Sequence, residues 1–289
     1  MIYTTAAFSA MIFTSLKDMV SKRLAGSVDG TVSTLASFAY TIPYYAVSLI
    51  VAILLGFPLG NIGISFWILV GLRSSTDALA EWLKMTALGN ADISLVAPFF
   101  ALSPVILLVL GPVFTGDHIT FRGGVGVLLT VLGTIGLLLK RGDSNGVTGA
   151  GSLRGILMAL GASVFFALNS LFDRLAVQQA SVLVSAAAMT AAATLPFIIP
   201  VWRSSERRIA FFAHSRLFHL RAILEVLFMT LKLFALCSLP SAYVTGLFRM
   251  AAIILIIAGK FVFKEKEIGK RLVWGSVIVA GSLLIVFSG

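Results

Sequence analysis

The chain has 289 residues, of which 58% are hydrophobic and only 12% are charged, and its mean hydropathy is +1.02. Soluble globular domains carry about 25% charged residues, so this composition excludes an ordinary soluble protein and indicates an integral membrane protein. The net charge of +10 is then explained by basic loops at a membrane face, and no nucleic-acid partner is expected.

Apolar runs long enough to cross a bilayer recur along the whole chain. Crossing the hydrocarbon core takes about 20 helical residues, and only helices or closed barrels satisfy the backbone in lipid. Because these runs are long and do not alternate, they predict an all-α protein. Ten transmembrane helices are expected, at residues 2–23, 31–56, 63–88, 91–115, 121–139, 153–174, 181–202, 217–237, 241–263 and 269–288.

Two longer polar segments interrupt this pattern. Residues 141–152 are rich in glycine and serine, which indicates a linker between two five-helix units at residues 1–140 and 153–289. The second segment, from Arg203 to His219, contains the run RRIAFFAHSRLF. That run fits a short basic amphipathic helix on the membrane surface and a solvated loop equally well.

The two units are related by an internal repeat, which is clearest at charged positions. Like charges recur at a constant shift of 148 residues, as Arg73 with Arg221, Asp77 with Glu225, and Lys84 with Lys232. The first helix of each unit corresponds more weakly, at a shift of 152. Since five helices is an odd number, the second unit enters the membrane from the opposite side. The sequence therefore predicts inverted repeats, an arrangement used for alternating access around a midplane site.

The segment Ser94–Asp117, with the glycine-spaced helix that follows it, resembles the fourth and fifth helices of EamA-type permeases in the drug/metabolite transporter superfamily. The matching features are Pro98 and Pro104, the acidic corner residue, and a second copy from Leu239 to Phe287 with Glu265 at its corner. The resemblance implies a transporter with this ten-helix fold. Because the family spans amino acids, sugars, nucleosides and drugs, it leaves the substrate open.

Four charged residues form one stripe of the third predicted helix. Arg73, Asp77, Glu81 and Lys84 follow one another at spacings of four, four and three, which places them on one helical face. A charge at the bilayer centre costs about 2.5–3.5 kcal/mol, so the stripe must face the bundle interior or a water-filled cavity. Two interpretations stay open. The residues pair internally, Arg73 with Asp77 and Glu81 with Lys84, or they contact substrate or protons.

Further site candidates come from comparing the two halves. Glu225 and Lys232 repeat the stripe, whereas Arg249 is a charge within a predicted helix that has no counterpart. Arg249 either pairs with an acidic neighbour or binds an anionic group of the substrate. Asn169 corresponds to Lys17, which lies near a helix end and is expected to extend its ammonium group to the membrane surface.

Three more candidates weaken a helix or offer an aromatic ring. Pro98 and Gly246 coincide under the repeat, and carbonyls freed there bind substrate or act as a hinge, unless both residues serve packing alone. Trp82, beside the charged stripe, is the aromatic residue that we expect to stack on a substrate.

The sequence predicts a secondary or facilitative transporter that moves a small polar metabolite by alternating access. Protons are conceivable co-substrates, because Asp77, Glu81 and Glu225 are candidate carriers. The alternative is a flippase for an amphipathic or lipid-linked molecule. An enzyme is not expected, because nucleotide, HExxH and CxxC motifs are missing from the sequence and its three histidines fall in predicted loops. The single cysteine excludes a cysteine-cluster metal site, and no cofactor is predicted.

The expected location is the cell membrane, with a monomer or homodimer in the bilayer. Lysine and arginine concentrate after the first, fifth, seventh and ninth predicted helices. The positive-inside rule then places both chain ends outside the cytoplasm, whereas the family resemblance implies ends inside. We favour the orientation with both chain ends outside the cytoplasm, because the charge distribution is read from this chain itself.

Overall fold

The computed structural model describes residues 2–25, 27–60, 62–100, 102–115, 120–139, 150–239, 241–248, 251, 254 and 268–287. These residues are almost entirely helical, and their only extended pairing is an isolated antiparallel bridge between Gly60 and Ala180. The predicted all-α class is therefore confirmed for the described part of the chain. The residues of the predicted linker up to position 149, the corner residues Asp117 and Glu265, and Arg249 lie outside it.

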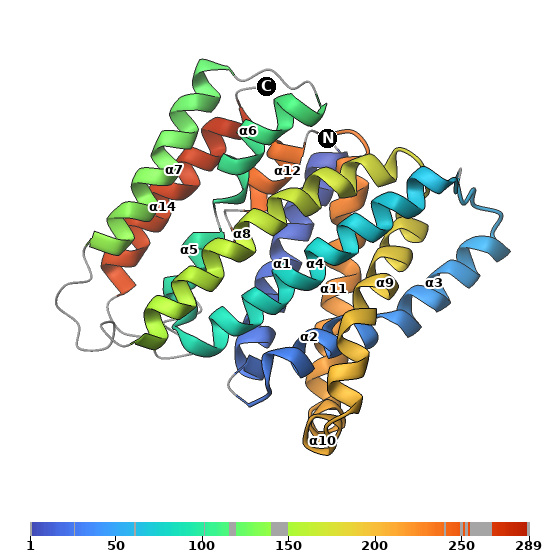
Figure 1. Ribbon diagram of the computed structural model, residues 1–289. Helices are drawn as coiled ribbons and strands as arrows, with labels where there is room; N and C mark the ends of the chain where they lie inside the picture. The colour runs from blue at the N-terminus through green and yellow to red at the C-terminus, as the bar shows by residue number, and fades with distance from the viewer. Residues whose placement is uncertain are drawn as a thin grey trace.

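The helices pack lengthwise into one bundle, in which the start of α1 and the end of α14 lie at the same end (Figure 1). The helices are α1 (Ile2–Ala25), α2 (Gly30–Ala39), α3 (Ile42–Leu54), α4 (Ile64–Asn90), α5 (Ile93–Phe100), α6 (Ser103–Thr115), α7 (Phe121–Leu139), α8 (Ala150–Val177), α9 (Val182–Trp202), α10 (Ser205–Ala213), α11 (Ser215–Leu236), α12 (Ser241–Phe248) and α14 (Ile268–Val286).

Three segments of the described chain are both long enough and apolar enough to cross a membrane. They are Gly30–Leu54, Leu153–Val177 and Val182–Trp202. Helices α1, α4 and α11 have comparable length but carry the charged residues of the site described below. The sequence predicted ten crossings, so the described helices support a membrane protein without establishing that number.

Two predicted spans are each built from two helices, and a proline stands at each break. Proline has no N–H to donate and its ring clashes with the carbonyl four residues earlier. Pro43 lies in the first turn of α3, directly after the break at Tyr40 and Thr41. Pro104 lies in the first turn of α6, where the hydroxyl of Ser103 donates to the carbonyl of Phe100 at 3.2 Å. This hydroxyl replaces the bond that the proline cannot make.

The basic segment after α9 is helical rather than a loop. It forms α10, whose N-cap residue Ser204 accepts a hydrogen bond from the Arg207 backbone N–H at 3.4 Å. α10 lies at the end of the bundle opposite to the start of α1 (Figure 1).

The described part is apolar outside and charged inside. Four aliphatic side chains of α3 are more than half exposed: Val47, Ile50, Ile53 and Leu54. By contrast, Arg73 on α4 is 4% exposed and Arg221 on α11 is fully buried. A soluble protein shows the reverse, and large exposed apolar surfaces are typical of proteins that contact lipid or partners. This inversion places the charged residues at the centre of the bundle.

Candidate functional site

Helices α1, α2, α4, α5, α8, α11 and α12 line a cavity of about 110 Å³. A buried water needs about 10–15 Å³ of such volume, so the cavity has room for several waters or a small polar ligand. Its charged lining residues are Lys17, Asp18, Arg73, Asp77, Glu81, Lys84, Glu225 and Lys232. Its aromatic lining residues are Phe38, Phe100, Phe166, Phe228 and Phe248.

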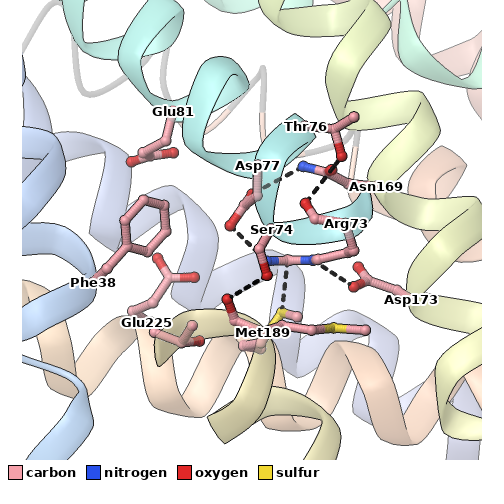
Figure 2. Close-up of polar contacts among 12 residues, drawn as sticks. Phe38, Arg73, Ser74, Thr76, Asp77, Glu81, Asn169, Asp173, Met189 and Glu225 are labelled. Carbon is pink, nitrogen blue, oxygen red and sulfur yellow. Dashed lines mark hydrogen bonds and ion pairs between the residues drawn. The ribbon is translucent and has the colours of Figure 1, made fainter. Parts of the chain in front are cut away.

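Arg73 on α4 connects three helices through its guanidinium group (Figure 2). It donates to Asp77 Oδ2 on its own helix at 2.6 Å and to Asp173 Oδ1 on α8 at 2.8 Å. Its third contact is with Met229 Sδ on α11, at 3.6 Å. The buried Asp173 is shared, because Lys232 Nζ lies 2.6 Å from its second oxygen. One carboxylate therefore balances two cations from different helices.

The second oxygen of Asp77 is also occupied. The Asn169 side-chain amide on α8 donates to Asp77 Oδ1 at 2.9 Å, and the Thr76 hydroxyl donates to Asn169 Oδ1 at 2.5 Å (Figure 2). Asn169 is thereby fixed in orientation by one donor and one acceptor. Because both oxygens of Asp77 are held, its carboxylate is rigidly oriented at the cavity wall.

Arg221 on α11 is the centre of a second cluster. It donates through Nε to the Ser21 hydroxyl on α1 at 2.8 Å and through Nη2 to Glu81 on α4. Lys84 joins the same cluster, with its ammonium group 2.8 Å from Asp18 Oδ1 and 3.4 Å from Glu81 Oε2. Both oxygens of Glu81 thus contact a cation.

Lys17 on α1 is buried and pairs with a carboxylate of α11. Its ammonium group lies 2.8 Å from Glu225 Oε2 and 4.1 Å from the centre of the Phe228 ring. The residue is 4% exposed, so the expectation that it extends to the membrane surface is wrong. The physical reason is that an ion pair and a cation–π contact are available in the interior.

Positions that correspond in the sequence repeat make corresponding contacts. Asn169 is equivalent to Lys17, and Asp77 is equivalent to Glu225. The structure pairs Asn169 with Asp77 and Lys17 with Glu225.

The two arginines follow the same rule, since Arg73 and Arg221 each use Nε and Nη2 toward equivalent partners. The two Nε partners, Asp173 for Arg73 and Ser21 for Arg221, are equivalent in the repeat. The two Nη2 partners, Met229 for Arg73 and Glu81 for Arg221, are equivalent as well.

The described network is electrically balanced. Its basic members are Lys17, Arg73, Lys84, Arg221 and Lys232, and its acidic members, equal in number, are Asp18, Asp77, Glu81, Asp173 and Glu225. The most exposed side chains are those of Glu225, at 16%, and Asp18, at 15%, whereas Arg221 and Asp173 are fully buried. Eight of the ten residues line the cavity, and only Arg221 and Asp173 are outside its lining.

The structure brings most of the predicted site residues together. Arg73, Asp77, Glu81 and Lys84 face the interior, as their spacing predicted, and the expected pairs of Arg73 with Asp77 and Glu81 with Lys84 are present. Asn169, Glu225 and Lys232 line the same cavity.

The other candidates lie differently. Trp82 is half-buried, and neither Trp82 nor Gly246, which is buried in α12, is among the residues that line the cavity. Pro98 lies within α5, but its side chain, like the whole of Arg249, is outside the described part.

Several residues of the network were not among the sequence candidates. Asp173, Asp18, Lys17 and Arg221 complete the clusters around the predicted stripe. Each is a charged residue inside or at the end of a predicted apolar helix, and that signal marks all four as interior groups. Among the described residues, no group of three or more His, Cys, Asp or Glu side chains is arranged to hold a metal ion.

No protein-family model and no curated protein matches this chain. The chain is similar to a solved structure described as "Crystal structure of protein", with 16% sequence identity and a TM-score of 0.68. The superposition covers 99% of this chain and 96% of that chain. At this identity the likeness shows that the fold is shared from end to end, and it assigns no activity.

Proposed function

We propose that the chain is a membrane transporter of the EamA-like drug/metabolite type, built as ten transmembrane helices in two inverted five-helix repeats. In this proposal a small polar molecule binds in the central cavity, which opens alternately to the two sides of the membrane. The observation that carries it is a charged cavity of about 110 Å³, enclosed by helices from both predicted units within a bundle whose surface is apolar.

The equivalent contacts of the two halves support the inverted repeat. If the halves are related by a half-turn in the membrane plane, equivalent residues must meet equivalent partners across the centre. The pairs Asn169 with Asp77 and Lys17 with Glu225 have this relation. A site at the interface of two such units can be closed by either unit, which is the physical basis of alternating access.

A purely structural role accounts for the closed pairs but not for the cavity-facing ones. Glu225 contacts Lys17 through Oε2, and Asp18 contacts Lys84 through Oδ1. A carboxylate has two oxygens that accept several hydrogen bonds, so in the described contacts each of these groups keeps an oxygen for water or substrate. The lysine ammonium groups likewise have three donors each.

The balance of charge among the described residues favours a substrate without net charge. A zwitterion or an uncharged polar molecule can exchange contacts with the ion pairs while the site stays neutral. A net ion would leave an excess charge in a poorly solvated interior, which is energetically costly. Protons carried on Asp77, Glu81 or Glu225 are a candidate driving force for transport, and the uptake measurements with and without a pH gradient test this coupling.

The proposal is tested with the purified full chain. A thermal-shift screen of zwitterionic, neutral, cationic and anionic metabolites identifies ligands, and uptake of each hit is then measured in proteoliposomes with and without a pH gradient. We expect net-neutral compounds to raise Tm and to be taken up. Hits that bind but never cross the bilayer, together with movement of a fluorescent lipid analogue between leaflets, would favour a flippase instead.

A further inference from the structure

Helix α10 is fixed to the bundle by one face only. Phe211 is buried, with its ring centre 5.1 Å from that of Tyr40 and 6.5 Å from that of Phe218. The Tyr40 hydroxyl donates to the Phe211 carbonyl at 3.0 Å. Figure 1 looks nearly along the axis of α10, so this helix crosses the neighbouring α9 and α11 rather than extending them.

Other apolar side chains in and beside α10 are exposed. Ile209 is 69% exposed and Phe212 is 59% exposed, and Trp202 at the end of α9 is 47% exposed. A helix that connects two predicted spans and exposes such residues is placed where the acyl chains of a bilayer meet its headgroups. Bulky apolar side chains beside arginines are typical of helices that lie in this interface.

The same segment carries exposed basic side chains, one directly after α9, one within α10 and one in the first turn of α11. Arg203, Arg208 and Arg216 are exposed and have no partner among the described contacts. Arg207 is engaged, since its Nε lies 3.2 Å from Asp29 and its Nη1 donates to the Pro200 carbonyl at 3.3 Å.

The remaining acidic group of this helix is Glu206, which is also exposed. Three arginines without a described partner, against one glutamate, leave a positively charged surface.

We propose that the α10 surface, formed by Arg203, Arg208 and Arg216 with Ile209 and Phe212, binds the headgroups of anionic phospholipids. The guanidinium groups donate in pairs to lipid phosphate oxygens, while the two apolar side chains enter the adjoining acyl region. A zwitterionic lipid also has a phosphate, but its own cation cancels the attraction. The preference for anionic lipids therefore comes from the net positive charge of the surface. This surface is separate from the central cavity, so the inference holds whatever the cavity transports.

The test uses the full chain in detergent micelles that contain either phosphatidylglycerol or phosphatidylcholine. Phosphatidylglycerol should raise the Tm of the unmodified protein by about 3–6 °C more than phosphatidylcholine does, given the usual strength of arginine–headgroup attraction and the size of the chain. The variant Arg203→Gln/Arg208→Gln/Arg216→Gln should lose this difference. The matched variant with lysine at the same three positions should keep most of it, and Arg122→Gln, at the start of α7, should keep all of it.

Four results would overturn the proposal. One is a phosphatidylglycerol effect that persists in the glutamine variant, and another is an equal effect of inorganic phosphate alone. If the glutamine variant does not fold, the unmodified protein still decides, because raising salt from 0.15 to 1 M shortens the screening length from about 8 to about 3 Å. A lipid effect that survives this change is not electrostatic. Finally, if Ile209→Ser/Phe212→Ser separates a dimer and the unmodified dimer shows no preference for phosphatidylglycerol, the surface binds a second copy of the chain.

Discussion

Glu81 and Glu225 belong to the same charged network, but their carboxylates are held differently. Glu81 contacts Arg221 with one oxygen and Lys84 with the other, and its side chain is 6% exposed. Glu225 contacts Lys17 with one oxygen and keeps 16% exposure at the cavity. Both residues line the cavity. A carboxylate whose two oxygens are each held by a cation maintains the fold, whereas one with a single cation contact can exchange that contact with a ligand.

This difference predicts opposite effects for the same substitution. Glu81→Gln leaves the fully buried Arg221 beside a neutral amide, and breaking a buried ion pair in this way costs about 3–5 kcal/mol. Tm should therefore fall steeply. Glu225→Gln should cost less than Glu81→Gln, because its partner Lys17 lines the cavity and keeps the Phe228 ring as a second contact. Uptake of the hit ligand should nevertheless fall at least about tenfold, measured beside Tm in proteoliposomes.

Asp173→Asn provides the control for this comparison. Asp173 is fully buried between Arg73 and Lys232, so its replacement should destabilise the protein as Glu81→Gln does. If Glu225→Gln melts as early as these two variants, its role is structural and the assignment of the cavity-facing pair is wrong. Unchanged Tm with unchanged uptake in Glu225→Gln would likewise exclude a role in transport.

At this scale the sequence predicts that the charged stripe of α4 is interior, but it misplaces Lys17 and does not specify which residues meet. The stripe on α4 follows from charge and helical spacing alone, and so do its local pairs. The pairing of Lys17 with Glu225 depends on the contact of α1 with α11, which no local pattern specifies. The repeat does not mark Asp173, because the equivalent residue in the first half is Ser21, which is uncharged.

Helices α7 and α14 pack against each other at glycines that are equivalent in the repeat. Their contact is made by Gly133 and Gly281, which are equivalent in the repeat. A Cβ atom on Gly281 would lie 2.6 Å from the Gly126 carbonyl and 2.8 Å from the Thr130 backbone nitrogen. Without side chains at these points the two backbones approach closely, as glycine-rich helix pairs do in membranes.

Gly281→Ala should therefore force α7 and α14 apart. The obstructing atoms of Gly126 and Thr130 include backbone that cannot rotate away, so we expect a loss of about 1–3 kcal/mol and a lower Tm. Gly124→Ala is the matched control on α7, because a Cβ atom added at that position would have nothing within 4 Å. Alanine favours helix there, and Tm should stay level or rise. Equal losses in the two variants would contradict a glycine-mediated contact.

The sequence predicts the boundaries of those elements whose ends are determined by residues close together in the chain. Seven predicted spans correspond to single helices, α1, α4, α7, α8, α9, α11 and α14. The breaks before α3 and α6 follow from Pro43 and Pro104, yet a hydropathy pattern joins both sides of each break into one run. α10 was undecided in the sequence because nine residues of mixed polarity fit a loop equally well. Its anchor, Phe211, packs against Tyr40, which is distant in the chain.

For the whole molecule, the distribution of charge along the bundle sets an orientation. The exposed arginines around α10 lie at the end opposite to the start of α1 and the end of α14 (Figure 1). Under the positive-inside rule the α10 end faces the cytoplasm, and the chain ends face away from it. This geometry agrees with the loop charges and disagrees with the orientation that the family resemblance implies.

The single cysteine of the chain tests this orientation directly. Cys237 is exposed and caps the C-terminal end of α11, whereas α10 precedes the N-terminal end of the same helix. A helix of 22 residues is about 33 Å long, close to the thickness of the hydrocarbon core. The proposed ten-helix arrangement therefore predicts that the two ends of α11 lie at opposite membrane faces. A membrane-impermeant maleimide should label Cys237 in intact host cells.

The matched experiment moves the thiol to the other end. In a Cys237→Ser background, Arg208→Cys should react only in inverted vesicles, because its side chain is exposed at the α10 end. If Cys237 reacts only in inverted vesicles and the thiol of Arg208→Cys reacts in intact cells, the chain ends lie in the cytoplasm, as the family resemblance implies. The α10 surface would then face away from the cytoplasm. Labelling of both thiols from the same side would mean that α11 does not cross the membrane, and the ten-helix proposal would then fail.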